Sequence, residues 1–258
     1  MPNRPQASDD ESSHRRWYHT LLDLVYPPHC VACGQPGAWL CTRCIQKASA
    51  YHPPVCPHCG TPVSPSGACH ACAGPIPCLA GVRVVGPYRP PLRQAIHALK
   101  YEGMRVLAAP LGAMLATAYR THALTPRLVV PVPLHPARIR QRGYNQALLL
   151  ARETGRRLDL ILHEKALVRR RDTPSQVGLG RSARRANVYG AFSCPATDVA
   201  GESLLLIDDV VTTGATLEAC ALPLLEAGAK AVWALVVARA LYRQSDDEPH
   251  DRPDGSVD

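Results

Sequence analysis

The sequence predicts an α/β protein in which a parallel β-sheet is flanked by helices and preceded by a small cysteine-rich module. Three observations support this fold class. Eight of the eleven cysteines form four C-x-x-C pairs before residue 73. From about residue 79, short apolar segments alternate with amphipathic ones. The repeated order of strand, polar loop and helix is typical of parallel sheets covered on both faces.

The composition is that of a globular chain with room for one core and an accessory module. Its 258 residues are 46% hydrophobic and 19% charged. The formal net charge is +8, although the segment 245–258 contributes six acids and one arginine, so the remainder is more basic than the total. Such a charge favours polyanionic partners, either nucleic acid or phosphorylated small molecules.

Nothing in the sequence indicates a membrane segment or a secretory signal. No apolar run approaches the ~20 residues needed to span a bilayer. The first residues, MPNRPQASDDESSHRRW, are polar where a signal peptide would be apolar. We therefore expect a cytoplasmic protein without membrane insertion.

The cysteine pairs predict two structural zinc ions. Two residues between cysteines let both thiolates face one ion, and two pairs complete a tetrahedral shell of four sulfurs. Sequential pairing would give two short ribbons, whereas the spacing also allows the first pair to share an ion with the third. His29, His58 and His70 adjoin these cysteines and could replace a ligand. The expected zinc ligands are Cys30, Cys33, Cys41, Cys44, Cys56, Cys59, Cys69 and Cys72.

The cysteine-rich segment has many prolines and glycines and few long aliphatic side chains, so zinc would supply its folding free energy. We divide the chain into a tail over 1–25, a double zinc ribbon over 26–78, a main domain over 79–243 and an acidic disordered tail over 244–258.

The main domain begins with a strand and two helices. GVRVVGPY alternates as a strand does over 81–88. The segment 91–103 starts at a proline, ends at a glycine and places Leu92, Ile96 and Leu99 on one helical face. An alanine- and leucine-rich helix follows over about 106–121.

The remaining elements repeat the strand, loop and helix order. RLVVPVP is a short buried strand whose prolines lead into a loop, and GYNQALLLARETGRRL is a helix. We expect further strands at 160–168, 204–207 and 231–238, and a helix over 216–227 that Gly228 ends.

The stretch LLLIDDVVTTGATLEAC has residues suited to a phosphorylated sugar. We expect a turn over 208–216 at the carboxyl end of a strand, where ligands of such sheets bind. Threonine hydroxyls, a glycine and the amides of the next helix favour phosphate. Asp208 and Asp209 suit vicinal hydroxyls or a magnesium ion that bridges to the ligand. The alternative is an acidic helix N-terminus capped by a threonine, but capping does not require the whole string.

LLLIDDVVTTGAT closely resembles the 5-phosphoribosyl-1-diphosphate (PRPP) binding motif of type I phosphoribosyltransferases. Three further segments, IHALKYEG, VVPVPLHPARIRQRGYNQALLLAR and RRRDTPSQVGLGRSARRANVYGAF, are similar to the ComF branch of that superfamily, also called the GntX or competence-protein F family. The resemblance extends from about residue 30 to about residue 239. It implies a type I phosphoribosyltransferase fold with an N-terminal double zinc ribbon.

The resemblance also implies the binding residues. The aspartates would hold the ribose hydroxyls, with magnesium, and the threonine-rich segment would wrap the 5-phosphate. The implied PRPP-binding residues are Asp208, Asp209, Val210, Val211, Thr212, Thr213, Gly214, Ala215 and Thr216.

Two basic regions could contact the diphosphate. Arg138, Arg140 and Arg142 lie in the loop expected after PVP, where the alternative is a solvated basic loop. The segment 169–187 resembles a flexible hood, with Gln176 and residues 181–185 as candidates for diphosphate or partner contact. Lys100 could point toward the site, but the preferred interpretation is a helix lysine extending to solvent.

The implied activity is phosphoribosyl transfer from PRPP to an acceptor that no side chain identifies. A glutamine-hydrolysing activity is unsupported, because no amidotransferase domain with its N-terminal cysteine is present. The alternative is a non-catalytic, PRPP-responsive protein that binds single-stranded DNA during DNA uptake in natural competence. The ribbons could also act as a cap or a docking module for a protein partner.

Overall fold

The structure is a computed structural model that describes residues 27–48, 51–69, 72, 74–171 and 187–240. Within these ranges, five strands form a sheet of order β1-β7-β6-β2-β3, and all neighbouring strands are parallel. The predicted parallel sheet is therefore confirmed. Its strands are β1 (Gly81–Pro87), β2 (Leu128–Pro131), β3 (Ile161–Leu162), β6 (Ser203–Val211) and β7 (Ala231–Arg239).

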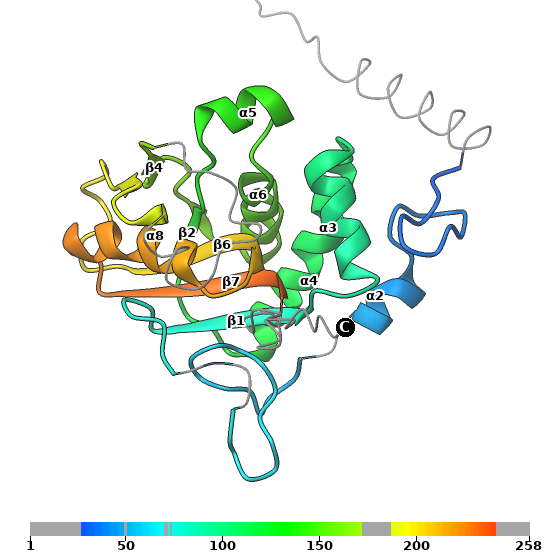
Figure 1. Cartoon of the computed structure of the whole chain (residues 1–258), viewed down its shortest axis with the longest axis horizontal. Coiled ribbons are helices and arrows are strands. Elements are labelled where there is room, and N and C mark those ends of the chain that lie inside the picture. Colours follow the sequence, from blue (N-terminus) through cyan, green and yellow to red (C-terminus); the bar gives the residue numbers. More distant parts are fainter. Residues whose placement is uncertain (1–26, 49–50, 70–71, 73, 172–186, 241–258) are drawn as a thin grey trace, which may run out of the picture.

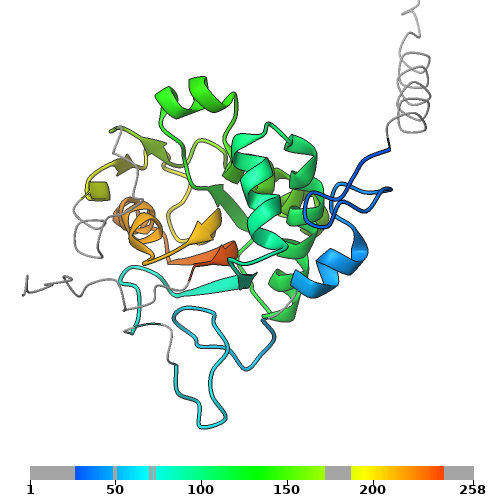
Figure 2. The same ribbon diagram turned by 45° about the vertical axis from the view of Figure 1, so that its right-hand side comes forward.

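Helices cover both faces of the sheet (Figure 1). One core cluster joins α3, α4 and α6 to one face, and a second joins α8 and the segment 188–199 to the other. Figure 2 shows α8 on one side of the strands and α3 and α4 on the other. The helices are α2 (Thr42–Ala48), α3 (Leu92–Tyr101), the 3-10 turn η1 (Arg105–Leu107), α4 (Ala108–Thr121), α5 (Pro136–Arg142), α6 (Gln146–Leu158) and α8 (Ala215–Glu226).

Two predicted elements are wrong. The strand expected over 160–168 is divided into β3 and β4 (Val168–Arg169) by a polar turn, and β4 pairs antiparallel with β5 (Phe192–Ser193). The loop expected after β2 contains helix α5. Its formation has a local cause, because the side chain of His135 accepts a hydrogen bond from the Ala137 amide and Pro136 occupies the first turn.

The turn expected over 208–216 is also shorter than predicted. Strand β6 continues to Val211 because β7 continues beside it, with Asp208 opposite Val236 and Val211 opposite Arg239. Helix α8 begins at Ala215, so three residues connect the strand to the helix. The two aspartates are therefore strand residues.

The segment 51–69, which belongs to the cysteine-rich region, packs against the sheet edge formed by β1 (Figure 1). A Cβ atom on Gly60 would lie 2.6 Å from the carbonyl oxygen of Val82, so only glycine permits this approach. The Arg83 guanidinium donates to the Pro57 carbonyl at 3.0 Å. These contacts cover a strand edge that would otherwise be exposed.

Candidate functional site

The cysteines form two groups of four in sequential order. Cys30, Cys33, Cys41 and Cys44 make the first group, and Cys56, Cys59, Cys69 and Cys72 make the second. In each group the sulfur atoms all lie within 4.8 Å of one another. Of the two pairings that the spacing allowed, the described residues show the sequential one.

The sulfur spacing fits zinc. Four sulfurs at a Zn–S distance of about 2.3 Å would be about 3.8 Å apart in a tetrahedron. The Sγ atoms of Cys33 and Cys41 are 3.7 Å apart, and those of Cys59 and Cys69 are 3.6 Å apart. Both four-cysteine groups are thus consistent with structural zinc.

A second candidate site lies where the strand connections diverge. From β6 the chain passes through α8 to β7, whereas from β2 it passes through α5 and α6 to β3 on the opposite side. Ligands of open α/β sheets bind beyond the carboxyl ends of strands at such a switch point. Strand β6 extends beyond its pairing with β2, which ends near Ile207, so its last residues border this position.

Asp208 and Asp209 are buried at this strand end. Asp208 Oδ1 accepts a hydrogen bond from the Asp209 amide at 2.8 Å. Burial, followed by the charge of Asp209, raises the pKa of Asp208 to about 7, although the charges of Lys100 and Arg169 act in the opposite direction. Two adjacent buried carboxylates are costly unless a cation or hydrogen-bond donors compensate their negative charge.

Lys100 compensates part of this negative charge. Its Nζ lies 2.6 Å from Asp209 Oδ1. Burial lowers the pKa of Lys100, but the charge and hydrogen bond of Asp209 and the charge of Asp208 together raise it above its ordinary value. The preferred interpretation of Lys100 as a solvent-directed lysine is wrong.

One oxygen of Asp209 has no partner among the residues that the structure describes. Its Oδ2 is buried and has no hydrogen bond within the described part of the chain. Such an oxygen can accept from a ribose hydroxyl or ligate a hard divalent cation, and carboxylate oxygens are the ligands that magnesium prefers. The residues present therefore fit a magnesium ion at this position.

The connection from β6 to α8 provides a tight loop. Gly214 has φ 86°, a left-handed conformation that favours glycine. The Thr213 hydroxyl accepts a long hydrogen bond of 3.4 Å from the Ala215 amide. Thr212 and Thr216 are partly exposed at either end of this turn. The arrangement places hydroxyls and the first amides of a 12-residue helix together, as an anion site requires.

Ile76, from the segment that follows the second cysteine group, lies against this loop. A Cβ atom added to Gly214 would lie 2.3 Å from Cδ1 of Ile76. Near the same strand end, Arg239 is buried and donates to the Cys59 carbonyl at 3.2 Å. The second cysteine group thereby contacts the end of β7, and the segment that follows it contacts the loop.

The three candidate arginines are all on α5. Arg142 lies with its guanidinium 5.2 Å from the centre of the Tyr101 ring at the end of α3, and it also donates to Gln146. Arg138 is partly exposed and Arg140 is exposed. The structure therefore places Arg142 beside the helix that carries Lys100.

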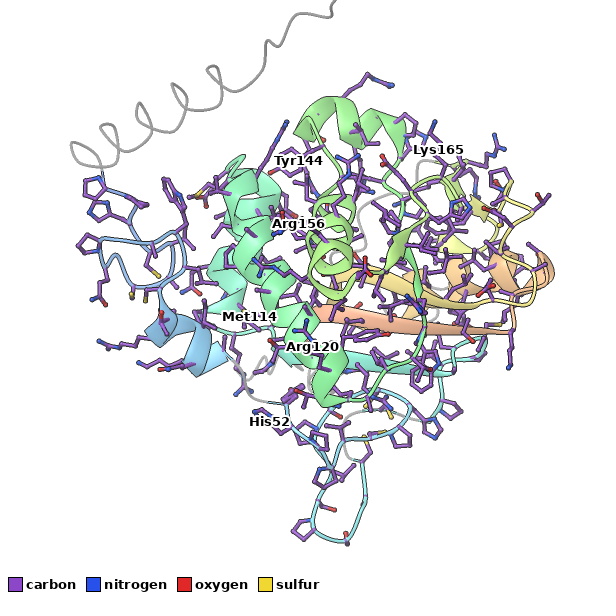
Figure 3. All side chains as sticks on the ribbon, turned by 180° about the vertical axis from the view of Figure 1, so that it is seen from behind. His52, Met114, Arg120, Tyr144, Arg156 and Lys165 are labelled. Atoms are coloured by element: carbon purple, nitrogen blue, oxygen red, sulfur yellow. The ribbon has the colours of Figure 1, made fainter. Side chains whose placement is uncertain are left out.

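The junction between α3 and the start of α6 is anchored by Tyr144 and Asn145. The buried Tyr144 hydroxyl donates to the Leu99 carbonyl, and Figure 3 shows Tyr144 beside α3. The Asn145 amide donates to the Val132 carbonyl at 3.0 Å, and its oxygen caps α6. These bonds fix the end of α3 relative to the loop that leaves β2.

Residues 172–186 of the expected hood, including Gln176 and Arg181–185, lie outside the described residues. Arg169, at the start of this segment, is described, and its charge opposes the rise in the pKa of Asp208. Sequence reasoning gave no site role to Ile76 and did not name Arg169 as a contact. No feature of the local sequence marks Ile76 as a site residue, whereas the basic run that begins at Arg169 is apparent in the sequence.

None of the helices in the described ranges is long and apolar enough to cross a bilayer.

Comparisons with known proteins match two parts of the chain. Residues 21–73 match the family described as "Double zinc ribbon domain", and residues 145–258 match "Phosphoribosyl transferase domain". "DNA utilization protein YhgH" of Escherichia coli (strain K12) is 34% identical over 228 residues, covering 84% of this chain and 100% of the relative. "Competence protein F" of Haemophilus influenzae is 32% identical over 209 residues, covering 78% of this chain and 90% of the relative.

Solved structures include a glutamine PRPP amidotransferase from B. subtilis complexed with ADP and GMP. It is 21% identical, covers 50% of this chain and 25% of that chain, and has a TM-score of 0.35.

Proposed function

Because this chain belongs to the ComF/GntX (competence protein F) family, we propose that it binds PRPP with magnesium at the end of β6 and transfers the phosphoribosyl group to an acceptor. The observation that carries the proposal is the pair of buried carboxylates at the switch point, followed directly by a glycine turn and a helix N-terminus. The phosphoribosyltransferase domain match over 145–258 includes this strand and helix.

The acidic pair and the loop would bind different parts of PRPP. Asp208 and Asp209 would accept hydrogen bonds from the ribose hydroxyls, and the Asp209 oxygen that has no partner among the described residues would accept one of these bonds. Val210 and Val211 continue the strand between the acids and the loop. The 5-phosphate would bind to Thr212, Thr213, Gly214, Ala215 and Thr216, where backbone amides and hydroxyls are available.

Transfer would break the bond between ribose C1 and the diphosphate oxygen, and the electron pair would leave with the diphosphate. The acceptor would then bond to C1 and lose a proton. Magnesium would neutralise charge on the diphosphate. Cationic side chains from α5, Arg138, Arg140 and Arg142, would lie on the diphosphate side, and the acidic pair would hold the sugar in position while C1 gains positive charge.

The first test is thermal protection. PRPP with magnesium should raise the melting temperature of the wild-type protein, and Asp208→Ala or Asp209→Ala should remove the increase. Asp198→Ala is a matched control, because that aspartate is exposed and pairs with His163. Equal protection of the wild type and both site variants would refute the assigned site.

The second test separates an enzyme from a protein that only binds the ligand. Diphosphate release from PRPP should be measured across nucleobases and amines as acceptors. Release with one acceptor class and not with buffer alone would support transfer and identify the substrate. Protection by PRPP without release from any acceptor would support a binding protein instead.

A second candidate function is the binding of single-stranded DNA in DNA uptake. The observations that favour it are the names of the relatives, "DNA utilization protein" and "Competence protein F", and the basic charge of the chain. Such binding should weaken steeply with salt and should survive Asp208→Ala. The absence of binding at low salt would eliminate this candidate.

A further inference from the structure

Among the described residues, Lys100 is a cation in direct contact with the acidic pair. Its Nζ lies 2.6 Å from Asp209 Oδ1, and the side chains of Lys100 and Asp209 are 19% and 3% exposed. The lysine comes from α3 and the aspartate from β6, so the pair joins two elements more than a hundred residues apart in the sequence.

Stability alone is a weak explanation for this pair. Removing two charges from water is costly, and well-packed apolar residues often replace a buried ion pair without loss of stability. The pair also leaves Asp209 Oδ2 without a hydrogen-bond partner among the described residues. Because this ion pair uses only one carboxylate oxygen, a ligand or a metal ion can replace Lys100 at Asp209 more readily than it could in a fully hydrogen-bonded pair that serves only to stabilise the fold.

The surroundings of Lys100 favour movement of the side chain rather than of the helix. The end of α3 is fixed by the hydrogen bond from Tyr144 to the Leu99 carbonyl. The lysine stem is flexible and ends in three hydrogen-bond donors. Arg142, one of the arginines assigned to the diphosphate side, lies over the ring of Tyr101, the residue next to Lys100. Lys100 and the ring that Arg142 contacts thus both lie at the carboxyl end of α3, and a rotation about the lysine stem moves Nζ away from Asp209.

We propose that Lys100 is a ligand-binding residue of this site, whose ammonium group neutralises Asp209 in the present arrangement and contacts the diphosphate of PRPP when a divalent cation takes its place at Asp209. The inference rests on the proposed binding of PRPP. It gives Lys100 two opposite effects, because the lysine competes with a divalent cation for Asp209 and attracts the anionic ligand.

The test compares Lys100→Gln with the wild type in two binding measurements. Glutamine retains an N–H donor for Asp209 and removes the charge. Without PRPP, Mn²⁺ binding followed by the electron paramagnetic resonance signal of the free ion should become at least five-fold tighter in Lys100→Gln. With magnesium present, PRPP binding followed by calorimetry should become at least ten-fold weaker.

Lys47→Gln is the matched control. Lys47 is also in the last turn of a helix, is exposed, and lies on α2 away from the acidic pair. Both affinities of this variant should stay within two-fold of the wild type.

The outcomes separate the inference from the proposed function. If the wild type binds PRPP and Lys100→Gln binds it within two-fold as tightly, only the assignment of Lys100 is overturned. If the affinities of the variant for Mn²⁺ and for PRPP both fall, Lys100 only holds the Asp209 side chain in position, and the assignment is again overturned. If the wild type does not bind PRPP, the proposed function fails and the inference fails with it.

A second variant keeps the test decisive should Lys100→Gln not fold. Lys100→Arg retains the charge opposite Asp209, but its planar guanidinium differs in reach and geometry from an ammonium group. A merely structural ion pair predicts an unchanged PRPP affinity, whereas direct contact with the diphosphate predicts a change of at least three-fold. A change below two-fold would overturn the assignment.

Discussion

The raised pKa of Asp208 predicts that this carboxylate destabilises the fold. Asp208→Asn is the appropriate perturbation, because the asparagine oxygen can still accept the hydrogen bond from the Asp209 amide at 2.8 Å. Burial and the charge of Asp209 raise the pKa of Asp208 from 3.8 to about 7. The native state therefore holds a proton over a range in which the unfolded chain has released it, and ionisation at higher pH weakens the native state.

The magnitude follows from the size of this shift. One pKa unit corresponds to about 1.4 kcal/mol, so a rise of roughly three units costs the native state about 4 kcal/mol above pH 8. At pH 5 the cost has reached only about 2 kcal/mol, because the native carboxyl is still protonated there. The advantage of Asp208→Asn over the wild type should therefore grow by about 2 to 3 kcal/mol between pH 5 and pH 8.

Urea unfolding in magnesium-free buffer with excess zinc measures this difference at each pH. Asp198→Asn is the control, because Asp198 is exposed and its hydrogen bond with His163 lowers its pKa, so its carboxyl is ionised throughout this pH range and its stability difference should stay constant. Asp209→Asn should instead destabilise the fold, since it removes the partner of the buried Lys100 ammonium. A stability difference for Asp208→Asn that is constant from pH 5 to pH 8 would refute the reasoning.

Three further predictions concern the supports of the site. Gly214→Ala should lower the free energy of unfolding by about 2 kcal/mol or more, because alanine is strained at φ 86° and its Cβ would collide with Ile76; chemical denaturation measures this, and an unchanged stability would contradict it. Tyr144→Phe should lower the same free energy by about 1 kcal/mol, because the Leu99 carbonyl loses its buried donor; a loss of stability above 3 kcal/mol would indicate another role. Metal analysis should return about two zinc ions per chain, and their removal by a chelator should lower the melting temperature; one ion or none would break the assignment of two sites.

Much of the sheet could be predicted because its strands are apolar runs with flanking turn residues. The length of β6 could not, because two aspartates within a buried strand contradict the pattern by which strands are recognised. The pairing of Asp208 with Val236 on β7 holds these residues in the sheet despite their charge. Helix α5 was missed for a similar reason, since the prolines before it indicate a loop and its cap comes from the side chain of His135.

The chemistry of the candidate site was visible in one continuous stretch, but the surrounding residues were not. Asp208, Asp209 and Gly214 are adjacent in the sequence, and their types alone indicate a cation or hydroxyl partner and a phosphate turn. Lys100 and Ile76 reach the same position from distant segments. No periodicity or spacing in a single chain connects such residues, because only the packing of α3 and of the segment after the second cysteine group brings them to the end of β6.

The packing also connects the second cysteine group to the end of β6. Ile76 fills the space beside Gly214, and Arg239, which pairs in register with Val211 of β6, donates to the Cys59 carbonyl. Because the segment that carries Cys59 has few aliphatic residues of its own, we expect a zinc ion at the second cysteine group to hold Cys59 and Ile76 in place. Loss of zinc from this group should therefore loosen the turn at Gly214 before it disturbs the opposite face of the sheet, where α3, α4 and α6 form a separate apolar cluster.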